Sequence, residues 1–335
     1  MSSPGRDERA GRPIDRLSFR PVRADELATC ASVWRSAING YIVPMNQHEV
    51  PTDLARVVRL FSHLQSTDPD RFVVATEPAD GTANEGVGEP ERIVAFGSAV
   101  VRERLWYLSM LFVLPEAQRA GLGRRLLSSL LPADETVVRA TATDSVQPIS
   151  NALYALHDIV PRMPLLSLTG LAERPEAFGE LPSGVVALPF DEIAAGSPDG
   201  LGHRMLVEAI DALDREVLGV AHPIDHRFLR GEARHGWLYR GPDGTPIGYG
   251  YAGEAGQVGP VATLDAALVA PILGHLTSAD SPRGAFAIWI AGAADRAVSA
   301  ALRAGFRLDQ FPVLLCWDRP FADFSRYLPN SPGLL

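Results

Sequence analysis

The sequence contains no lysine, so all 31 basic residues are arginine. A GC-rich coding sequence accounts for this composition better than a selected binding role, although each guanidinium group is suited to phosphate oxygens. Cysteine is nearly as scarce, because only Cys30 and Cys316 occur, far apart and without a CxxC pair. This spacing excludes a disulfide framework and a cysteine zinc site. We therefore expect two buried free thiols.

Long apolar runs are also absent. A run such as LSMLFVLP, from Leu108 to Pro115, has the length of a strand, far below the roughly 18 residues that span a bilayer. Residues 1–16 are polar and lack the apolar segment of a signal peptide, which predicts a disordered tail. The formal charge of −9, without a basic run, argues against a nucleic-acid partner. These features predict a cytoplasmic protein with neither a membrane nor a nucleic-acid partner.

A length of 335 residues favours two domains, and 46% hydrophobic with 21% charged residues is typical of globular proteins. Apolar periodicity predicts the order β-α-α-β-β-β-α-β-α-β in residues 17–171. Residues 172–183 are rich in proline, glycine and glutamate, which predicts a linker. A similar order of elements returns in residues 184–335.

The two predicted domains share a local signature. RMPLLS at 162–167 corresponds to QFPVLL at 310–315, and each follows a helix rich in alanine and leucine. A spacing of about 148 residues is too long for a solenoid repeat. The pattern indicates a duplicated domain, although chance similarity between short apolar stretches stays open.

The segment from Val113 to Arg124 carries the clearest chemical signal. An apolar strand ends, a loop reads Gln-Arg-Ala-Gly-Leu-Gly, and a helix begins at once. Glycines let successive backbone N–H groups face one concavity, and the helix dipole adds positive potential there. We expect a pyrophosphate to bind, with Arg119 and Arg124 donating charge-assisted hydrogen bonds.

Other interpretations of this loop compete. A dinucleotide-binding motif would need a third glycine where Leu126 stands, and six residues separate Leu114 from Gly121. A P-loop would need a lysine, which the chain lacks. Glycines that only begin a helix, without a ligand, remain an alternative.

The motif V-x-P-x-x-Q-R-x-G-x-G resembles the acetyl-CoA pyrophosphate loop of the GNAT acetyltransferase superfamily. The resemblance covers nearly the whole chain after residue 16 and implies an α/β (α+β) fold of two tandem GNAT-like domains, each a mixed, mostly antiparallel sheet flanked by helices. It implies that the backbone of the preceding strand binds the pantetheine arm and that the loop binds the pyrophosphate of acetyl-CoA or another short acyl-CoA. The implied cofactor residues are Leu111, Phe112, Val113, Gln118, Arg119, Gly121, Leu122, Gly123 and Arg124.

A second similarity to this superfamily lies at 151–156, NALYAL. It implies that Asn151 contacts the cofactor and that Tyr154 stands beside the acyl sulfur. Residues three apart share one helix face, and a phenol there can protonate the departing thiolate as a general acid. The superfamily usually continues with Gly-Phe, where this chain has Asp158-Ile159, so the backbone turn is left open.

The base and the second domain are less well marked. No carboxylate lies between Trp106 and Leu114, so we expect a water chain or a neutral amine, with Glu103, Asp144 and His157 as possible relays. In the second domain the matching stretch lacks the glycine loop, and Ala301 stands where the first has Tyr154. Cofactor binding there is expected to be lost, and this domain is expected to help wall the acceptor pocket.

A polar cluster in the second domain has two interpretations. Asp214, Arg215, Glu216, His222 and residues 225–227 could recognise an acceptor, but we favour a solvated helix with salt bridges. No HExxH-like spacing is present, so we expect no metal.

Together these observations predict a bacterial enzyme that transfers an acyl group from acyl-CoA to a primary amine of a small molecule, acting as a monomer or homodimer. O-acylation, acylation of a protein N-terminus, and a non-catalytic acyl-CoA sensor are the alternatives.

Overall fold

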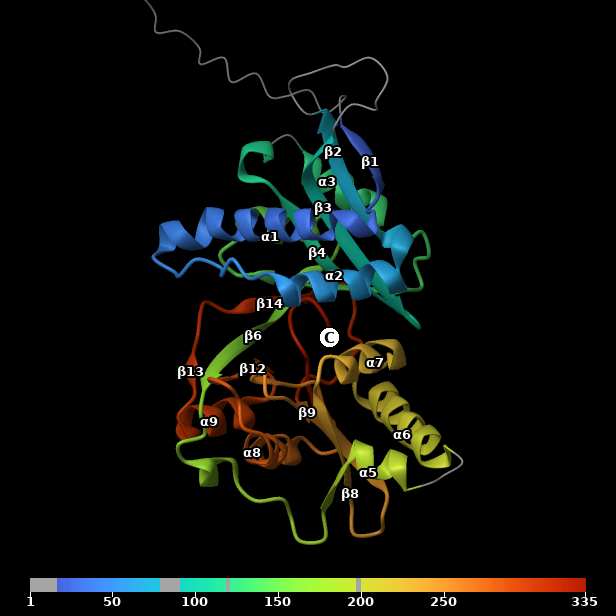
Figure 1. Cartoon of the computed structure of the whole chain (residues 1–335), viewed down its shortest axis with the longest axis vertical. Coiled ribbons are helices and arrows are strands. Elements are labelled where there is room, and N and C mark those ends of the chain that lie inside the picture. Colours follow the sequence, from blue (N-terminus) through green and yellow to red (C-terminus); the bar gives the residue numbers. More distant parts are fainter. Residues whose placement is uncertain (1–16, 79–90, 119–120, 197–199) are drawn as a thin grey trace, which may run out of the picture. The chain divides into compact units, whose positions relative to one another are not determined.

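The computed structural model describes residues 17–78, 91–118, 121–196 and 200–335, and the chain divides into two compact units (Figure 1). Of the described residues, those up to 100 and from 110 to 131 form the first unit, and those from 101 to 109 and from 132 onward form the second. Strand β4 (Leu105–Val113) contributes to both. In the described part of the chain, no helix has the length and apolar character needed to cross a membrane.

In the first unit, strand β2 (Phe72–Pro78) pairs antiparallel with β1 (Ser18–Pro21) on one side and β3 (Glu91–Arg102) on the other. The α-helices are α1 (Leu27–Ile42), α2 (Ala55–Thr67) and α3 (Leu122–Leu130). Single 3-10 turns η2 to η5 cover Ala24–Glu26, Val43–Met45, Pro69–Arg71 and Pro115–Ala117.

Alternation along β3 decides which helix covers which face. The ring of Phe96 lies 5.3 Å from that of Phe61 on α2. The next residue points to the opposite face, and a Cβ atom at Gly97 would lie 2.6 Å from the Leu130 side chain on α3. Helices α2 and α3 therefore cover opposite faces of this sheet, and α3 packs so closely that only glycine fits at position 97.

The second unit contains most of two sheets. In one, β4 pairs parallel with β5 (Val138–Asp144), and the order continues through β14 (Val313–Trp317), β6 (Val160–Gly170), β12 (Phe286–Ala291) and β10 (Gln257–Val258). Strand β13 (Arg307–Leu308) also pairs with β6. The other is antiparallel, in the order β15 (Tyr327–Leu328), β11 (Val261–Thr263), β9 (Pro246–Ala252), β8 (His235–Arg240) and β7 (Val186–Pro189). These mixed, mostly antiparallel sheets confirm the predicted fold class.

The repeated signatures lie side by side. Leu165 on β6 pairs directly with Val313 on β14, its counterpart in the sequence repeat. Around this pair the contacts are reciprocal, because Gly292 N–H donates to the Pro164 carbonyl at 2.8 Å and Ser145 N–H donates to the Pro312 carbonyl at 3.1 Å. Strand β14 thus lies between β5 and β6, so strands from the two sequence repeats alternate in one sheet.

Helices of the second unit are α4 (Pro148–Ala155), α5 (Phe190–Ala195), α6 (Leu201–Val217), α7 (Pro223–Gly231), α8 (Val269–Ala279) and α9 (Asp295–Ala304), with 3-10 turns at η6 (Pro175–Phe178) and η7 (Ala266–Leu268). Sequence periodicity did not predict α5 or α7. Within the predicted linker, Phe178 is buried and packs 6.0 Å from the ring of Phe306. The apolar cluster around α8, α9 and β12 forms the core here.

Candidate active site

In the first unit, β4 ends with three of the predicted cofactor residues, Leu111, Phe112 and Val113, all of them half-buried. The Phe112 ring lies 5.7 Å from that of Phe96 and 6.5 Å from that of Trp34. Because these aromatic contacts hold the side chain, the group left for ligand recognition in this segment is the backbone.

The predicted glycine loop leads directly into helix α3. Gln118 donates from its side-chain amide to the Val113 carbonyl at 3.2 Å, which ties the loop to the end of the strand. Gly121 caps the helix with φ of 76°, a left-handed conformation that glycine adopts without strain. Arg119 lies outside the described residues.

The N-terminus of α3 suits an anion. The first N–H groups of a helix have no partner within it, and the first turn of this nine-residue helix contains no acidic residue. Leu122 is buried and anchors the turn, whereas the Arg124 side chain is exposed. Gly123 lies between them. The local geometry therefore offers backbone donors together with a guanidinium group.

In the second unit, the ladder between β4 and β5 ends at the pair Leu108 and Thr141. The Thr141 hydroxyl donates to the Leu108 carbonyl at 2.8 Å. On its other side, β5 pairs with β14 as far as Asp144. The end of β5 is thus held by β14 rather than by β4.

Asn151 lies on the first turns of α4. Its amide nitrogen donates to the Asp144 carbonyl at 3.1 Å and to the Gln147 carbonyl at 2.8 Å, which fixes the turn between β5 and α4. Its Oδ1 atom is buried and has no hydrogen-bond partner among the described residues. A buried acceptor without a donor is costly, so this atom fits a ligand that donates an N–H or O–H group.

Tyr154 is buried on the same helix, and its neighbours come from distant parts of the sequence. Burial raises the pKa of its phenol, and Cys316 and Asp144 raise it further. The group therefore stays protonated at neutral pH, as a general acid must. No local pattern around Tyr154 could have indicated Cys316, which arrives with β14. Both cysteines are buried free thiols as predicted, and burial raises the pKa of each to about 12.

The turn after α4 was left open by the Asp158-Ile159 sequence. Asp158 adopts φ of 64°, and Ile159 N–H donates to the Tyr154 carbonyl at 3.1 Å. In the second repeat Gly305 has φ of 114°, and Phe306 N–H donates to the Ala301 carbonyl at 3.0 Å. Both helices end in this six-to-one bond, a Schellman turn. Asp158 therefore replaces the usual glycine without changing the turn.

One candidate proton relay is already engaged. Glu103, which has φ of 47°, forms an ion pair with Arg215 at 2.8 Å. His157 is half-buried just beyond α4, and Asp144 ends β5. The carboxylate of Glu103 is thus held by Arg215.

The second repeat differs at both key positions. Asp265 accepts a hydrogen bond from Ala267 N–H at 2.8 Å, so a carboxylate already caps the turn that precedes α8. Ala301, which corresponds to Tyr154 in the repeat, is buried and has no acidic group.

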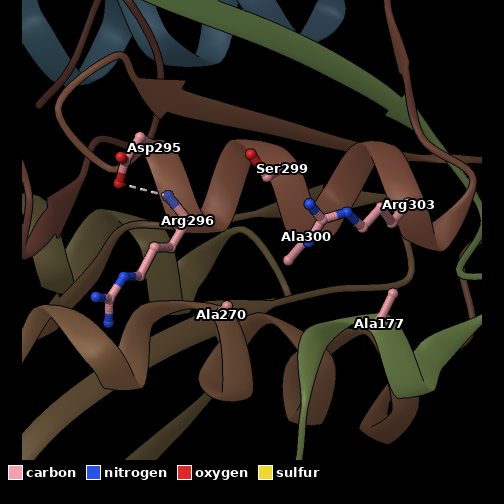
Figure 2. Close-up of a pocket in the computed structure, with 7 residues that line it drawn as sticks. All are labelled: Ala177, Ala270, Asp295, Arg296, Ser299, Ala300 and Arg303. Carbon is pink, nitrogen blue, oxygen red and sulfur yellow. Dashed lines mark hydrogen bonds between the residues drawn. The ribbon is translucent and has the colours of Figure 1, made fainter.

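A cavity of about 340 Å³ lies beside α9 (Figure 2), lined by Ala177, Ala270, Asp295, Arg296, Ser299, Ala300 and Arg303.

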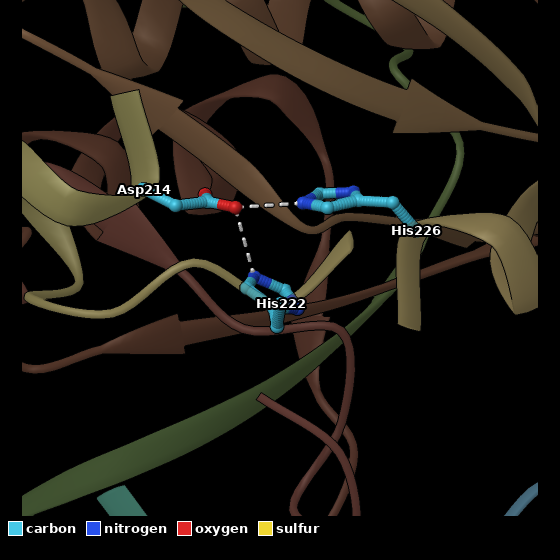
Figure 3. A group of neighbouring side chains, drawn as sticks. All are labelled: Asp214, His222 and His226. Carbon is cyan, nitrogen blue, oxygen red and sulfur yellow. Dashed lines mark hydrogen bonds and ion pairs between the residues drawn. The ribbon is translucent and has the colours of Figure 1, made fainter. Parts of the chain in front are cut away.

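The polar cluster is not a solvated helix face. Asp214, His222, Asp225 and His226 are all buried, so the favoured interpretation was wrong for these four residues. Asp214 Oδ2 lies 2.8 Å from His226 Nε2 and 3.3 Å from His222 Nε2 (Figure 3). This burial could not be predicted from the sequence, because the charged residues follow one another closely, a pattern typical of a solvated surface.

Charges within the cluster set its protonation. Burial would raise the pKa of Asp214, but His222 and His226 outweigh burial and lower it. Burial would lower the pKa of His222, but Asp214 and Asp225 raise it to about 10. For His226, burial prevails and the pKa falls. One carboxylate thus faces one imidazolium and one neutral imidazole.

Part of the chain matches a known family model. Residues 45–157 match the family model described as "Acetyltransferase (GNAT) family". No curated protein matches the chain in sequence.

Three solved structures resemble almost the whole chain. A putative acetyltransferase from Pyrococcus horikoshii is 15% identical with a TM-score of 0.68, covering 99% of this chain and 100% of its own. A GCN5-related N-acetyltransferase from Sphaerobacter thermophilus is 17% identical with a TM-score of 0.57, covering 93% and 99%. A tandem GNAT protein from the clavulanic acid biosynthesis pathway is 15% identical with a TM-score of 0.50, covering 91% and 99%. At these identities the likeness concerns the fold.

Proposed function

We propose that this chain, whose residues 45–157 match the GNAT acetyltransferase family model and whose fold is that of a tandem GNAT protein, transfers an acyl group from acetyl-CoA, or another short acyl-CoA, to a primary amine of a small molecule. The observation that carries the proposal is the start of α3. A glycine-capped helix without acidic residues in its first turn is the next α-helix after β4, from which residues 114–121 separate it.

The proposed cofactor site uses backbone donors. Residues Leu111 to Val113 would bind the pantetheine arm, and Gln118, Arg119 and residues 121–124 would bind the pyrophosphate, as the family resemblance implies. The unsatisfied Asn151 Oδ1 supports a ligand donor near α4.

The proposed chemistry is direct transfer. The amine nitrogen attacks the thioester carbonyl carbon, a C–N bond forms, and the C–S bond then breaks. Backbone N–H groups of β4 would stabilise the oxyanion. The departing thiolate takes the phenolic proton of Tyr154, and the proton lost by the amine passes to water or to a relay such as Asp144 or His157. The phenol is then reprotonated from solvent.

A second candidate function is acyl-CoA sensing without turnover. It is favoured by one observation, the lack of a carboxylate between Trp106 and Leu114. Acyl transfer to a hydroxyl or to a protein N-terminus would use the same cofactor site. The acyl-transfer candidates differ in the acceptor whose acylation releases CoA, whereas the sensor would release none.

The discriminating experiment is a screen for thiol release from acetyl-CoA against amines, amino acids, aminoglycosides, alcohols and peptides. We expect release that depends on both a small primary amine and the enzyme. Product mass should increase by one acyl group on nitrogen. Tight binding of acyl-CoA without release, across the whole panel, would favour the sensor and contradict the enzyme.

A further inference from the structure

Three donor atoms meet inside the second unit. Asp214 lies on α6, His222 precedes α7, and His226 lies in the first turn of α7. One ligand atom from each lies within 4.8 Å of the others, and all three residues are buried (Figure 3). Bonds of about 2.0–2.1 Å in a tetrahedral zinc site place ligand atoms about 3.3 Å apart. The 3.3 Å between His222 Nε2 and Asp214 Oδ2 matches this separation, and the 2.8 Å to His226 Nε2 is shorter.

In each of the three side chains, the nitrogen or oxygen atom that faces away from the cluster also has a neighbouring polar group. His226 Nδ1 lies 2.9 Å from the Tyr251 hydroxyl, and Tyr249 donates its hydroxyl to Asp214 Oδ1 at 2.5 Å. His222 Nδ1 lies 3.6 Å from Asp225 Oδ2. Metal-ligating histidines usually have such a carboxylate or oxygen on the second nitrogen, which fixes the tautomer and ring orientation.

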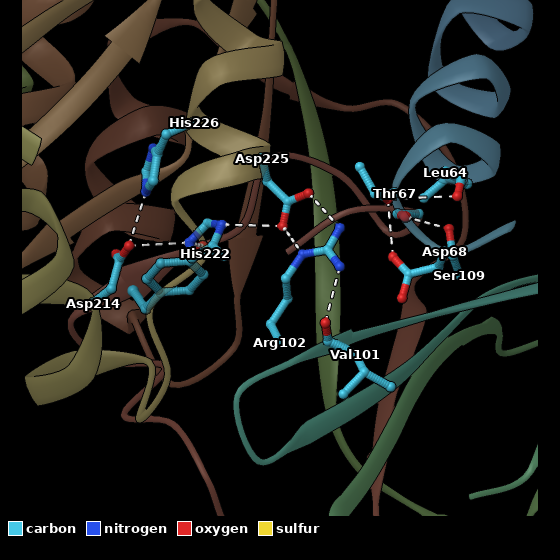
Figure 4. A network of polar contacts seen from close by, with 12 residues as sticks. Leu64, Thr67, Asp68, Val101, Arg102, Ser109, Asp214, His222, Asp225 and His226 are labelled. Atoms are coloured by element: carbon cyan, nitrogen blue, oxygen red, sulfur yellow. Dashed lines mark hydrogen bonds and ion pairs between the residues drawn. The ribbon is translucent and has the colours of Figure 1, made fainter. Parts of the chain in front are cut away.

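Asp225 is itself held in place. Arg102 binds it through two nitrogens, at 2.7 and 2.8 Å (Figure 4). This bidentate pair balances the charge of Asp225 and leaves Arg102 committed to it. Arg102 therefore orients His222 through Asp225 rather than neutralising Asp214.

The carboxylate of Asp214 is buried and depends on the groups around it for charge balance. Its side chain has an exposed fraction of 0%, and a buried charge without a partner is costly. Asp211 lies one helical turn earlier on α6, and its buried Oδ1 has no hydrogen-bond partner among the described residues. One buried carboxylate beside two imidazoles suits a divalent ion.

We propose that Asp214, His222 and His226 bind a divalent transition-metal ion, with Zn²⁺ as the best fit. Two imidazole nitrogens and one carboxylate oxygen are a donor set that zinc accepts. The Tyr327 hydroxyl, 3.5 Å from His222 Nε2, or a water molecule completes the tetrahedron. The ion links α6, α7 and, through the tyrosines, β9. This site revises the expectation of no metal and is independent of the acyl-transfer proposal.

Metal content of the full-length protein, prepared without a histidine tag or chelator, tests the site. We expect elemental mass spectrometry to find about one equivalent of zinc per chain. Removal with a chelator should lower the melting temperature, and added Zn²⁺ should restore it, because an ion that binds only the folded state stabilises it. Co²⁺ added to the metal-free protein should give the visible absorption of a tetrahedral complex.

Two matched variants locate the ion. His226→Gln should weaken Zn²⁺ binding at least tenfold. The control, His275→Gln, removes another imidazole of the same unit, one that is hydrogen-bonded to Tyr239, and should retain Zn²⁺ binding. Wild-type protein that contains no metal, shows no Co²⁺ absorption and keeps its melting temperature with Zn²⁺ would overturn the proposal, and the cluster would then be an imidazolium–carboxylate pair. Full binding by His226→Gln would equally overturn it. The wild-type measurements decide the question even where a variant fails to fold.

Discussion

The hydroxyl of Tyr154 is the single group on which the proposed chemistry depends most. Tyr154→Phe should reduce kcat while CoA affinity stays nearly unchanged, because the ring still packs and only the phenolic proton is lost. General-acid catalysis is typically worth about 10²–10⁴-fold, so we expect a loss of that order. The measurement is the single-turnover rate at saturating acyl-CoA, which removes product release from the comparison.

The pH dependence provides a second check on this residue. Since burial raises the pKa of Tyr154, the phenol should keep its proton well above neutral pH.

In the single-turnover comparison, rates of wild-type and Tyr154→Phe protein within about twofold would mean that water protonates the thiolate.

Gly121 tests the anion site at the start of α3. Gly121→Asp should lower CoA affinity at least about tenfold, or about 1.4 kcal/mol, because a carboxylate would repel the pyrophosphate. Gly121→Asn is the matched control, since asparagine has nearly the same shape and also tolerates the left-handed φ of 76°. Calorimetric titration of both variants gives the comparison. Equal affinities for Asp and Asn would remove the helix start from the site.

At the scale of elements, a carboxylate fastens the N-terminal strand of the first unit to α1. Glu26 accepts hydrogen bonds from Arg20 at 2.7 Å and from Arg23 N–H at 2.9 Å. The hydrogen bond from Arg20 outweighs the opposing effect of burial and lowers the pKa of this carboxyl below its ordinary value of 4.5. A lowered folded-state pKa means that the stabilisation is complete above the unfolded value and is lost as pH falls through the folded value.

Glu26→Gln should therefore destabilise the protein at neutral pH and have progressively less effect below about pH 4.5. The expected difference at neutral pH is about 1 kcal/mol, since these ion pairs are partly exposed. Urea unfolding of both proteins across this range measures it. A difference that grew with acidity would have the opposite sign and would contradict the assignment.

Strand β14 makes the sheet around α4 depend on the end of the chain. It pairs with β5 from Val313↔Asp144 to Trp317↔Ala140, and with β6 on its other side. A protein truncated after residue 172 would lack this strand, so facing edges of β5 and β6 would be unpaired. We expect such a fragment to aggregate or to lose activity.

Solubility and acyl-transfer rate of residues 1–172, with and without co-expressed residues 173–335, measure this dependence. Recovery on co-expression would identify the missing strand as the cause. A soluble fragment with full activity would show that neither β14 nor the rest of the second repeat supports the site.

These elements also show what sequence could predict. Helix periodicity is local, so apolar spacing in the sequence can predict a helix such as α2, on which Phe61 and Leu64 are buried. The strand order could not be read in the same way, because pairing of β14 with β5 joins residues far apart in sequence. The backbone turn at Asp158 could not be predicted from the sequence for another reason. The left-handed φ that glycine usually supplies is also open to aspartate, and only the backbone reveals it.

At the scale of the whole molecule, the duplication was visible but its consequence was not. The shared signature near Pro164 and Pro312 indicated two repeats, whereas the direct pairing of Leu165 with Val313 makes one sheet from both. Burial of the Asp214 cluster was equally hidden, because closely spaced charges usually indicate a solvated face. Buried polar groups need specific partners, and here those partners, Arg102 and Tyr251, come from other segments.

The two repeats should differ in cofactor binding, which gives the last prediction. In the first repeat the helix that follows β4 is capped by Gly121, whereas in the second Asp265 occupies the equivalent turn and already accepts the Ala267 N–H. A carboxylate there would repel a pyrophosphate and compete for the same donors. Calorimetric titration of the whole chain with CoA should therefore give a stoichiometry near one. Gly121→Asp should remove that single binding event without exposing another. A wild-type value near two would mean that the second repeat binds CoA by other residues and that the asymmetry inferred from these two helix starts is wrong.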